Sequence, residues 1–215
     1  MVIAIDGPAG AGKGTIAKLV ADKLNFVYID TGAMYRCVAL YALRNGIADN
    51  SLKIIESLKE IKIRFDDTGR TFLNDEDVTD AIRSREVTDI VSPISTILPV
   101  RENMTNQQRE MAKGVNVVME GRDITTVIFP NAEYKFYLDA SIDERIRRRV
   151  KQNAEKGIFS DYDEIKKSIE ERDYNDMHKR VGALKRTDEQ IYIDSTNMQK
   201  EEVVDFIIKR VGEVK

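Results

Sequence analysis

The sequence contains few of the residues that form disulfides or bind transition metals. Its 215 residues include one cysteine, Cys37, one histidine, His178, and no tryptophan. One cysteine cannot form an internal disulfide, and one cysteine with one histidine provides no Cys/His metal cluster. The composition therefore argues against a disulfide-stabilised secreted domain and against a zinc module, and we expect a protein of the reducing cytoplasm.

A long apolar run and a basic excess are also missing. No stretch is apolar for long enough to cross a bilayer, and the chain opens on MVIAID without a basic leader. We therefore expect a soluble protein that has no membrane contact and is not exported. The net charge of −3 argues against a nucleic-acid partner, because surfaces that bind nucleic acid usually carry a basic excess.

The four prolines mark no flexible linker, and no internal repeat or low-complexity segment is present. With 42% hydrophobic residues, a chain of this length can bury one sizeable core. We therefore expect a single domain over residues 1–215, with insertions rather than a second independent domain.

Short apolar runs alternate with segments of helical periodicity. Strands are expected at 2–6, 26–30, 115–120, 134–139 and 191–194, and helices from Lys13, at 33–45, at 51–61 with Ser51 as cap, after Pro99, and at 200–211. This alternation predicts an α/β fold with a mostly parallel five-stranded sheet and helices on both faces. Ligands of such sheets bind outside the carboxyl ends of the strands.

Residues 61–78 break the alternation. IKIRFDD and TFLNDEDV read as short strands on either side of a turn at Gly69. We interpret this segment as a small antiparallel insertion in the parallel fold.

The segment GPAGAGKGT has the spacing of a phosphate-binding loop and lies between a predicted strand and an amphipathic helix. Small residues let backbone N–H groups converge on phosphate oxygens at a helix N-terminus, while Lys13 adds a positive charge. The alternative is a structural turn. The residues expected to bind a nucleotide are Gly7, Pro8, Ala9, Gly10, Ala11, Gly12, Lys13, Gly14 and Thr15.

Gly14 stands where most such loops carry a magnesium-binding Ser or Thr. We therefore expect Mg²⁺ to be held mainly by nucleotide phosphates and water, with Thr15 or Glu120 as candidate protein contacts. A GTPase-like switch is disfavoured because it depends on that hydroxyl. The GKGT segment resembles the adenylate and cytidylate kinase branch of the nucleoside monophosphate kinases.

Several further segments extend this resemblance over nearly the whole chain. IDGPAGAGKGT, DTGAMYR, EGRD, FPNAEYKFYLDAS and ERD follow one another as in bacterial-type cytidylate kinases. The resemblance implies a P-loop kinase core, an inserted NMP-binding subdomain over 61–98 and a helical lid over 152–178. It also implies a monomer that transfers the γ-phosphoryl group of ATP, with Mg²⁺, to CMP and dCMP.

The resemblance also implies roles for individual residues. Arg101 and Asp123 would read the base with help from Ser92, and Arg36 and Arg122 would hold the acceptor phosphate. Arg172 and Asp176 would bind the ribose, and Lys179 stands at a phosphate-binding position. Thr31, at a position where the family usually has a small hydroxyl residue, is the remaining candidate for substrate binding. Any of the arginines could instead form a surface ion pair, and the main alternative for Asp123 is a helix cap.

The segment ERIRRRVK (144–151) carries a cluster of arginines. Such a charge run can be a solvated helix face. As part of a lid it would supply positive charge to the migrating phosphoryl group and exclude water. Helical spacing puts two or three of Arg145, Arg148 and Arg149 on one face. We expect Lys13, Arg122, Arg148 and Arg149 to serve catalysis, with direct in-line transfer and no covalent intermediate.

Four positions depart from the family pattern. Glu120 stands in place of the commoner aspartate, Thr125 replaces a glycine, and VGALK (181–185) lacks a proline after the lid. Lys179 replaces an arginine and cannot offer a bidentate fork, although Arg180 follows it.

Two other functions stay open at this point. One is a P-loop kinase that acts on another nucleotide or on a hydroxylated metabolite. The other is a binding protein that senses ATP without turnover.

Overall fold

The computed structural model describes residues 1–155 and 157–213. Residue 156, inside the expected lid range 152–178, and residues 214–215 lie outside the described residues. The main sheet has five strands in the order β2-β6-β1-β7-β8, and all its pairings are parallel. Its strands are β1 (Val2–Asp6), β2 (Val27–Asp30), β6 (Val117–Gly121), β7 (Tyr134–Asp139) and β8 (Ile191–Asp194). The predicted α/β fold with a five-stranded parallel sheet is confirmed.

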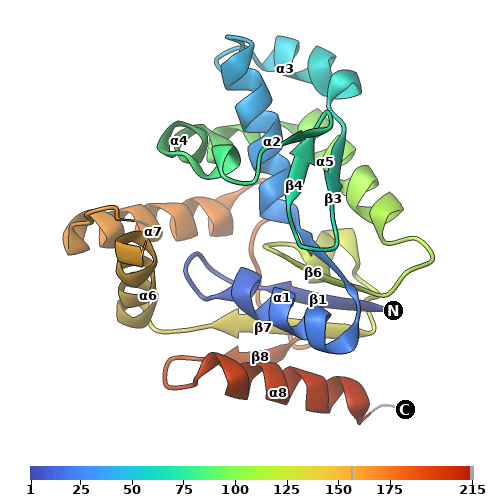
Figure 1. Cartoon of the computed structure of the whole chain (residues 1–215), viewed down its shortest axis with the longest axis vertical. Helices are drawn as coiled ribbons and strands as arrows, with labels where there is room; N and C mark the ends of the chain where they lie inside the picture. The colour runs from blue at the N-terminus through green and yellow to red at the C-terminus, as the bar shows by residue number, and fades with distance from the viewer. Residues whose placement is uncertain (156, 214–215) are drawn as a thin grey trace.

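Helices cover both faces of this sheet (Figure 1). Ile3 and Ile5 of β1 pack in one core cluster with residues of α1 (Lys13–Leu24) and α8 (Lys200–Gly212). Ala4 between them belongs to the other cluster, with α2 (Thr31–Arg44) and α5 (Leu98–Met111). Successive side chains of a strand point to opposite faces, so buried strands of this kind need apolar residues at nearly every position.

The inserted part forms a second, three-stranded antiparallel sheet, as expected. It contains β3 (Ile63–Phe65), β4 (Thr71–Leu73) and β5 (Glu76–Asp77), and is preceded by α3 (Ser51–Ser57) and the 3₁₀ turn η1 (Leu58–Glu60). The predicted cap of α3 was wrong by one residue. The side chain of Asn50, not Ser51, accepts a hydrogen bond from the N–H of Lys53, at 3.1 Å.

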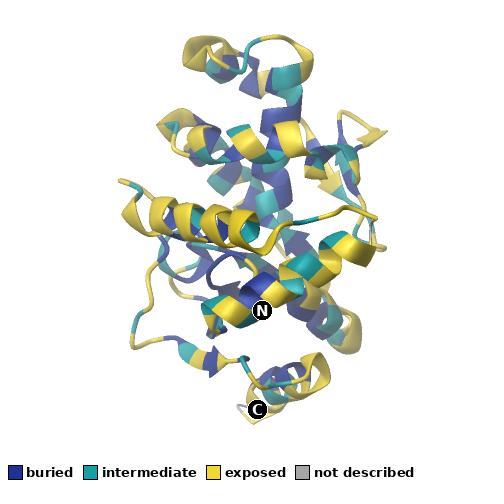
Figure 2. Ribbon diagram, turned by 90° about the vertical axis from the view of Figure 1, so that its left-hand side faces the viewer, coloured by how far each residue is buried: buried dark blue, intermediate teal, exposed yellow. Residues whose placement is uncertain are grey.

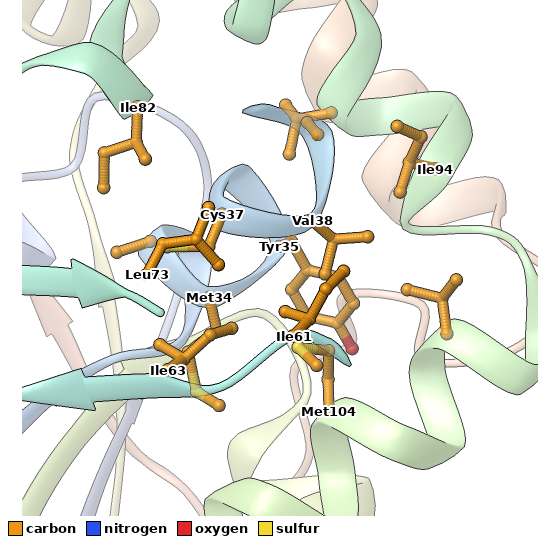
Figure 3. Packing of buried hydrophobic residues seen from close by; sticks show 14 of the residues in the cluster. Met34, Tyr35, Cys37, Val38, Ile61, Ile63, Leu73, Ile82, Ile94 and Met104 are labelled. Atoms are coloured by element: carbon orange, nitrogen blue, oxygen red, sulfur yellow. The ribbon is translucent and has the colours of Figure 1, made fainter. Parts of the chain in front are cut away.

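The sequence patterns did not predict the helical end of the insertion, which contains the 3₁₀ turn η2 (Ala81–Arg83) and α4 (Arg85–Ile94). Apolar side chains join this part to α2. In Figure 3, Met34 and Cys37 of α2 lie among Ile63, Leu73 and Ile82 of the insertion. The insertion and the parallel sheet therefore share one core cluster through α2.

Two helices, α6 (Ile142–Glu155) and α7 (Tyr162–His178), project beside the sheet (Figure 1). Most residues of α7 are exposed, whereas α6 carries exposed and half-buried residues in similar numbers (Figure 2). Their contact with the rest of the protein includes a small cluster of Ala9, Ile146 and Ile169. A π-helical turn, η3 (Ile124–Ile128), follows β6. None of the described helices has the length and apolar composition that a membrane crossing requires.

Candidate active site

The loop from Gly7 to Gly12 connects β1 to α1, with Gly12 as the N-cap residue of α1. The unpaired amides of the first helical turn therefore open onto this loop, as a phosphate site requires. A Cβ atom on Gly7 would lie 2.0 Å from the carbonyl oxygen of Leu138, so a side chain cannot be accommodated there. Lys13 is buried and donates from Nζ to the carbonyl oxygen of Pro8, at 2.8 Å.

Two carboxylates end neighbouring strands beside Lys13. Asp30 and Glu120 are register partners in β2 and β6. Burial raises the pKa of Glu120, and the charge of Asp30 raises it further. Burial lowers the pKa of Lys13, and Arg122 adds to that effect. Lys13 and Glu120 partly compensate each other, because the charge of each favours the charged form of the other, but burial outweighs this effect in both. A bound phosphate would stabilise the charged Lys13, and a divalent cation would stabilise the charged Glu120.

The donor set fits Mg²⁺, which prefers carboxylate oxygens and keeps several waters. The described residues contain no group of three or more His, Cys, Asp or Glu side chains suited to a metal ion. Glu120 and Asp30 would therefore need phosphate and water oxygens to complete a shell. A Cβ atom on Gly14 would lie 3.4 Å from Glu120 Oε1 and 3.4 Å from the Tyr28 hydroxyl. Thr15 is exposed on α1.

Arg101 and Asp123 form a buried ion pair, with 5% and 6% of their surfaces exposed. Nη1 of Arg101 also donates to the carbonyl oxygen of Ser95, at 3.2 Å, and its guanidinium lies 5.6 Å from the ring centre of Tyr35. Burial raises the pKa of Asp123 to about 6, against the lowering effect of Arg101. Asp123 precedes η3 without a side-chain capping bond, so the alternative cap role is wrong.

Ser92 lies half-buried on α4. Its carbonyl oxygen accepts from the hydroxyl of Ser95, at 2.8 Å, and it is Ser95 that contacts Arg101 in the structure. Thr31 begins α2, and its hydroxyl donates to the carbonyl oxygen of Glu120, at 2.8 Å. Thr31 thus joins the ends of β2 and β6.

Asp176 on α7 gathers three of the predicted cations. Arg122 Nε and Lys179 Nζ each lie 2.7 Å from its carboxylate, and Arg172 Nε lies at 4.0 Å. Burial alone would raise the pKa of Asp176, but Arg122 and Lys179 hold it below its usual range. Arg180 is exposed, whereas Lys179 faces the site.

Arg36 reaches toward the insertion. Its Nη1 donates to the hydroxyl of Thr88 at 2.9 Å and to the carbonyl oxygen of Ile82 at 3.2 Å. Burial lowers its pKa to about 10, with further lowering by Arg172 and Arg83. Several cations therefore face one small region, and their mutual repulsion favours a bound anion.

Sequence reasoning missed Arg83, which ends η2 and lies 3.3 Å from Asp30. It adds a positive charge from the insertion to the same region. It was missed because the helical part of the insertion, to which it belongs, was itself not predicted.

The three candidate arginines of the segment 144–151 have different contacts. Arg145 is buried, pairs with Asp173, and donates to the carbonyl oxygens of Ala9 at 2.8 Å and Ala140 at 3.1 Å. Arg148 donates to the carbonyl oxygens of Ala11 at 3.1 Å and Ser195 at 2.6 Å. Arg149 is exposed and donates to Gln152 at 2.9 Å. The simple alternative of a solvated helix face therefore fails for Arg145 and Arg148.

Asp173 also escaped the sequence analysis, although it stands in the quoted ERD segment. Its carboxylate accepts from the N–H of Ala9, at 2.9 Å, while it pairs with Arg145. The phosphate loop and both lid helices therefore meet at one buried carboxylate.

Comparison with known proteins identifies the family in which this arrangement of residues occurs. The sequence model described as "Cytidylate kinase" matches residues 3–213. A cytidylate kinase of Fusobacterium nucleatum is 47% identical, with 100% of this chain and 99% of that protein covered. One of Leuconostoc mesenteroides is 48% identical, over 94% of this chain and 92% of that protein.

Similarity to solved structures concerns the fold alone. An uncharacterised protein from Eubacterium ventriosum has a TM-score of 0.56 at 13% identity, with 99% of this chain and 98% of that one covered. A Thermus thermophilus protein has a TM-score of 0.51 at 14% identity, with 100% and 98% covered. The full-length sequence matches, together with a phosphate loop beside converging arginines, show that the chain belongs to the cytidylate kinase family.

Proposed function

We propose that the protein transfers the γ-phosphoryl group of ATP to CMP, and also to dCMP, and so forms CDP or dCDP and ADP. The observation that carries the proposal is the buried Arg101–Asp123 pair on the acceptor side of the phosphate loop. Such a pair offers donors and acceptors in fixed positions and is expensive to bury without a recognition role.

The pair complements cytosine. Cytosine donates from its N4 amino group and accepts at N3 and O2, so a carboxylate can accept from N4 while a guanidinium donates to the acceptors. Uracil has an acceptor at position 4 and a donor at N3, which would leave buried groups unpaired. A site of this kind can reject the wrong base by about 10⁴-fold. Ser92 would add a contact to the base after a small movement of α4.

The cations around Asp176 suit the rest of the acceptor nucleotide. Arg36 and Arg122 would bind its phosphate, with Thr31 beside them and Lys179 as a further point charge. Arg172 and Asp176 would bind the ribose, and Asp176 would exchange its present cation partners for sugar hydroxyls. If the 2′ contact is dispensable, dCMP is also accepted.

For the donor nucleotide, the backbone of Gly7–Thr15 would surround the ATP phosphates and Lys13 would bridge the outer ones. When bound, Mg²⁺ would neutralise phosphate charge, and Glu120 would contact it or its waters, with Thr15 as the alternative. Arg148, fixed on the phosphate loop, and Arg149, on the exposed face, would add charge to the migrating group. Arg122 would contact both the phosphate of the acceptor nucleotide and the phosphoryl group in transfer. The reaction then needs positioning and charge alone, without a covalent enzyme intermediate.

We further propose that residues 152–178 act as a lid and residues 61–98 as the NMP-binding subdomain, and that the enzyme works as a monomer. Most residues of α7, the main helix of this lid range, are exposed, and its apolar contact with the phosphate loop is the small cluster of Ala9, Ile146 and Ile169, which supports a closing motion.

The experiment is steady-state ADP formation from ATP and Mg²⁺ with CMP, dCMP, UMP, AMP and GMP as acceptors. CMP and dCMP should lead in kcat/KM, and Lys13→Ala should abolish turnover with every acceptor. A purine nucleotide at a comparable kcat/KM would contradict the assignment of the acceptor. Tight ATP binding without transfer to any of the five would indicate a sensor instead.

A further inference from the structure

The hydroxyl of Thr125 lies in a buried network under the turn that carries Asp123. Asp6 at the end of β1 is fully buried and accepts from three donors of this turn. Its Oδ1 accepts from the N–H of Ile124 at 2.9 Å, and its Oδ2 accepts from the N–H and the hydroxyl of Thr125 at 2.8 and 2.6 Å. Asp6 therefore fixes the backbone directly after Asp123.

Gln190 extends this network to another part of the chain. Its Nε2 donates to the Thr125 hydroxyl at 2.5 Å and to the carbonyl oxygen of Lys185 at 3.3 Å, and its Oε1 accepts from the N–H of Thr187 at 2.7 Å. Because the Thr125 hydroxyl donates its single proton to Asp6, it can only accept from Gln190. Every hydrogen-bonding group of the Gln190 amide thus has a partner, and two of its partners lie in the turn 185–190.

The segment before this turn covers the base-reading pair. It comprises residues 179–186 after α7, its last two residues belong to the turn, and Gly182 lies directly against Arg101 and Asp123. A Cβ atom there would lie 1.9 Å from Arg101 Nη2 and 2.5 Å from Asp123 Oδ2. After Gly182 the segment is tied back to α7 by the N–H of Leu184, which donates to the carbonyl oxygen of Asp176 at 2.8 Å.

We infer that the Thr125–Gln190 hydrogen bond holds the segment 179–186 in register over the Arg101–Asp123 pair, which makes Thr125 and Gln190 positioning residues for the acceptor base. The inference rests on the proposed role of that pair in reading cytosine. Neither residue need touch the substrate. They link Asp6, on one side of the Arg101–Asp123 pair, to the segment that carries Gly182 on the other side. This link limits the space into which a base can enter.

Loss of the Thr125–Gln190 hydrogen bond should weaken binding of the acceptor nucleotide and leave binding of ATP nearly unchanged. In Thr125→Val the side chain keeps its shape, and Asp6 keeps the two N–H donors, but one N–H of Gln190 is left without a partner. The segment over the pair then loses one of its anchors. Asp6, which directly precedes the phosphate loop, loses one donor but keeps the N–H groups of Ile124 and Thr125, so ATP binding should change less than CMP binding. A general loss of structure would affect ATP and CMP alike.

The test compares Thr125→Val with Thr126→Val as its matched control. The hydroxyl of Thr126 is buried and has no hydrogen-bond partner among the described residues. We expect Thr125→Val to raise the KM for CMP by about fivefold or more, the factor that one lost hydrogen bond typically produces, and to change the KM for ATP by less than about twofold. Thr126→Val should leave both constants unchanged, and Thr125→Ser should restore the CMP value.

Gln190→Met removes the amide that donates to the Thr125 hydroxyl, and it keeps the length of the side chain. It also removes the amide's bonds to Lys185 and Thr187, so it should raise the KM for CMP at least as much as Thr125→Val. The double variant should be no worse than Gln190→Met alone, because both changes remove the Thr125–Gln190 contact. Equal changes in both KM values, or additive effects in the double variant, would overturn the inference.

The Asp123→Asn variant separates this inference from the proposed function. If Asp123→Asn alters the preference for CMP over UMP while Thr125→Val behaves like Thr126→Val, the positioning role is wrong and the base-reading role stands. If Asp123→Asn leaves that preference unchanged, the base-reading role itself fails.

Discussion

Arg122 on the turn after β6 donates from Nε to Oδ2 of Asp176 on α7, at 2.7 Å, and so joins the acceptor side of the sheet to the lid. Asp176 also accepts from Lys179, at 2.7 Å, and is 4% exposed. One carboxylate thus holds cations that are proposed to bind the acceptor nucleotide.

Replacing Asp176 by Asn should lower both stability and affinity for CMP. Removing one member of a buried ion pair leaves the other charge without compensation, at a cost of about 3 kcal/mol in the free energy of unfolding. The KM for CMP should rise by about tenfold, the factor for one lost charged hydrogen bond. Urea unfolding and steady-state kinetics measure the two effects.

Glu171→Gln on the same helix is the control. Its partner is Lys167 at 3.9 Å, and both side chains are exposed, so the variant should change the free energy of unfolding by less than about 0.5 kcal/mol. A similar loss of stability in both variants would contradict the special role of Asp176.

The preference for CMP over UMP should depend on pH through Asp123. Burial raises the pKa of Asp123 to about 6, so its carboxylate gains a proton as the pH falls through that value. A protonated carboxyl accepts poorly from cytosine N4 and can donate to uracil O4. The ratio of kcat/KM for CMP to that for UMP should therefore fall between about pH 7.5 and about pH 5.5.

Phosphate groups titrate near pH 6 as well, with a second pKa of about 6. The ratio removes this contribution, because both acceptors carry the same phosphate. In Asp123→Asn the ratio should be low and independent of pH. A ratio that stays constant in the wild-type protein would argue against an ionised Asp123 as the acceptor for N4.

The unusual Gly14 should tolerate serine. Its Cβ atom would make ordinary contacts of 3.4 Å with Glu120 Oε1 and the Tyr28 hydroxyl. The added hydroxyl would lie beside the proposed magnesium contact, so Gly14→Ser should keep its fold and need less Mg²⁺ for half-maximal rate. Gly7→Ala is the contrasting change, because its Cβ atom would lie 2.0 Å from a backbone oxygen and should prevent stable folding. An unfolded Gly14→Ser protein, or a higher Mg²⁺ requirement, would refute this account of the loop.

ATP binding should take up protons through Lys13. Burial lowers the pKa of Lys13 in the ligand-free protein, and the charge of Arg122 lowers it further. The phosphates of ATP favour the ammonium form, so its pKa rises on binding and a proton is taken from the buffer. Calorimetry at about pH 8, without Mg²⁺ and in buffers of different ionisation enthalpy, measures this uptake.

Lys13→Met should remove the uptake, whereas Lys18→Met should keep it, because Lys18 lies in an exposed part of α1 and donates to Thr68. A binding enthalpy that is the same in all buffers would show that Lys13 is already fully charged before ATP binds.

The predicted parts of the fold are those with a local signal. Apolar runs that end in Asp6, Asp30 and Glu120 marked three strands and the edge at which the ligand binds. The pairing of Arg101 with Asp123 was expected from the resemblance and is present as a direct contact. The antiparallel insertion was marked by its turn at Gly69.

The helix α4 was missed although a signal exists. Ser84 caps it, and Val87, Val91 and Ile94 are buried at helical spacing. Pro93, inside its last turn, masks the pattern in the sequence. The buried contact of Asp173 with Ala9 joins residues 164 positions apart, and no local pattern predicts it. The same holds for Gln190 and Thr125, which are brought together only when β8 completes the sheet.

The central claim is that ATP gives its γ-phosphoryl group directly to CMP. A single-turnover reaction of the protein with ATP that carries a radiolabel in the γ-phosphate, with Mg²⁺ and excess CMP, tests it most directly. The label should pass to CDP at the rate at which ATP disappears, with no labelled protein and no turnover in Lys13→Ala. Label in inorganic phosphate or bound to the protein, with CMP unchanged, would contradict direct transfer to the nucleotide.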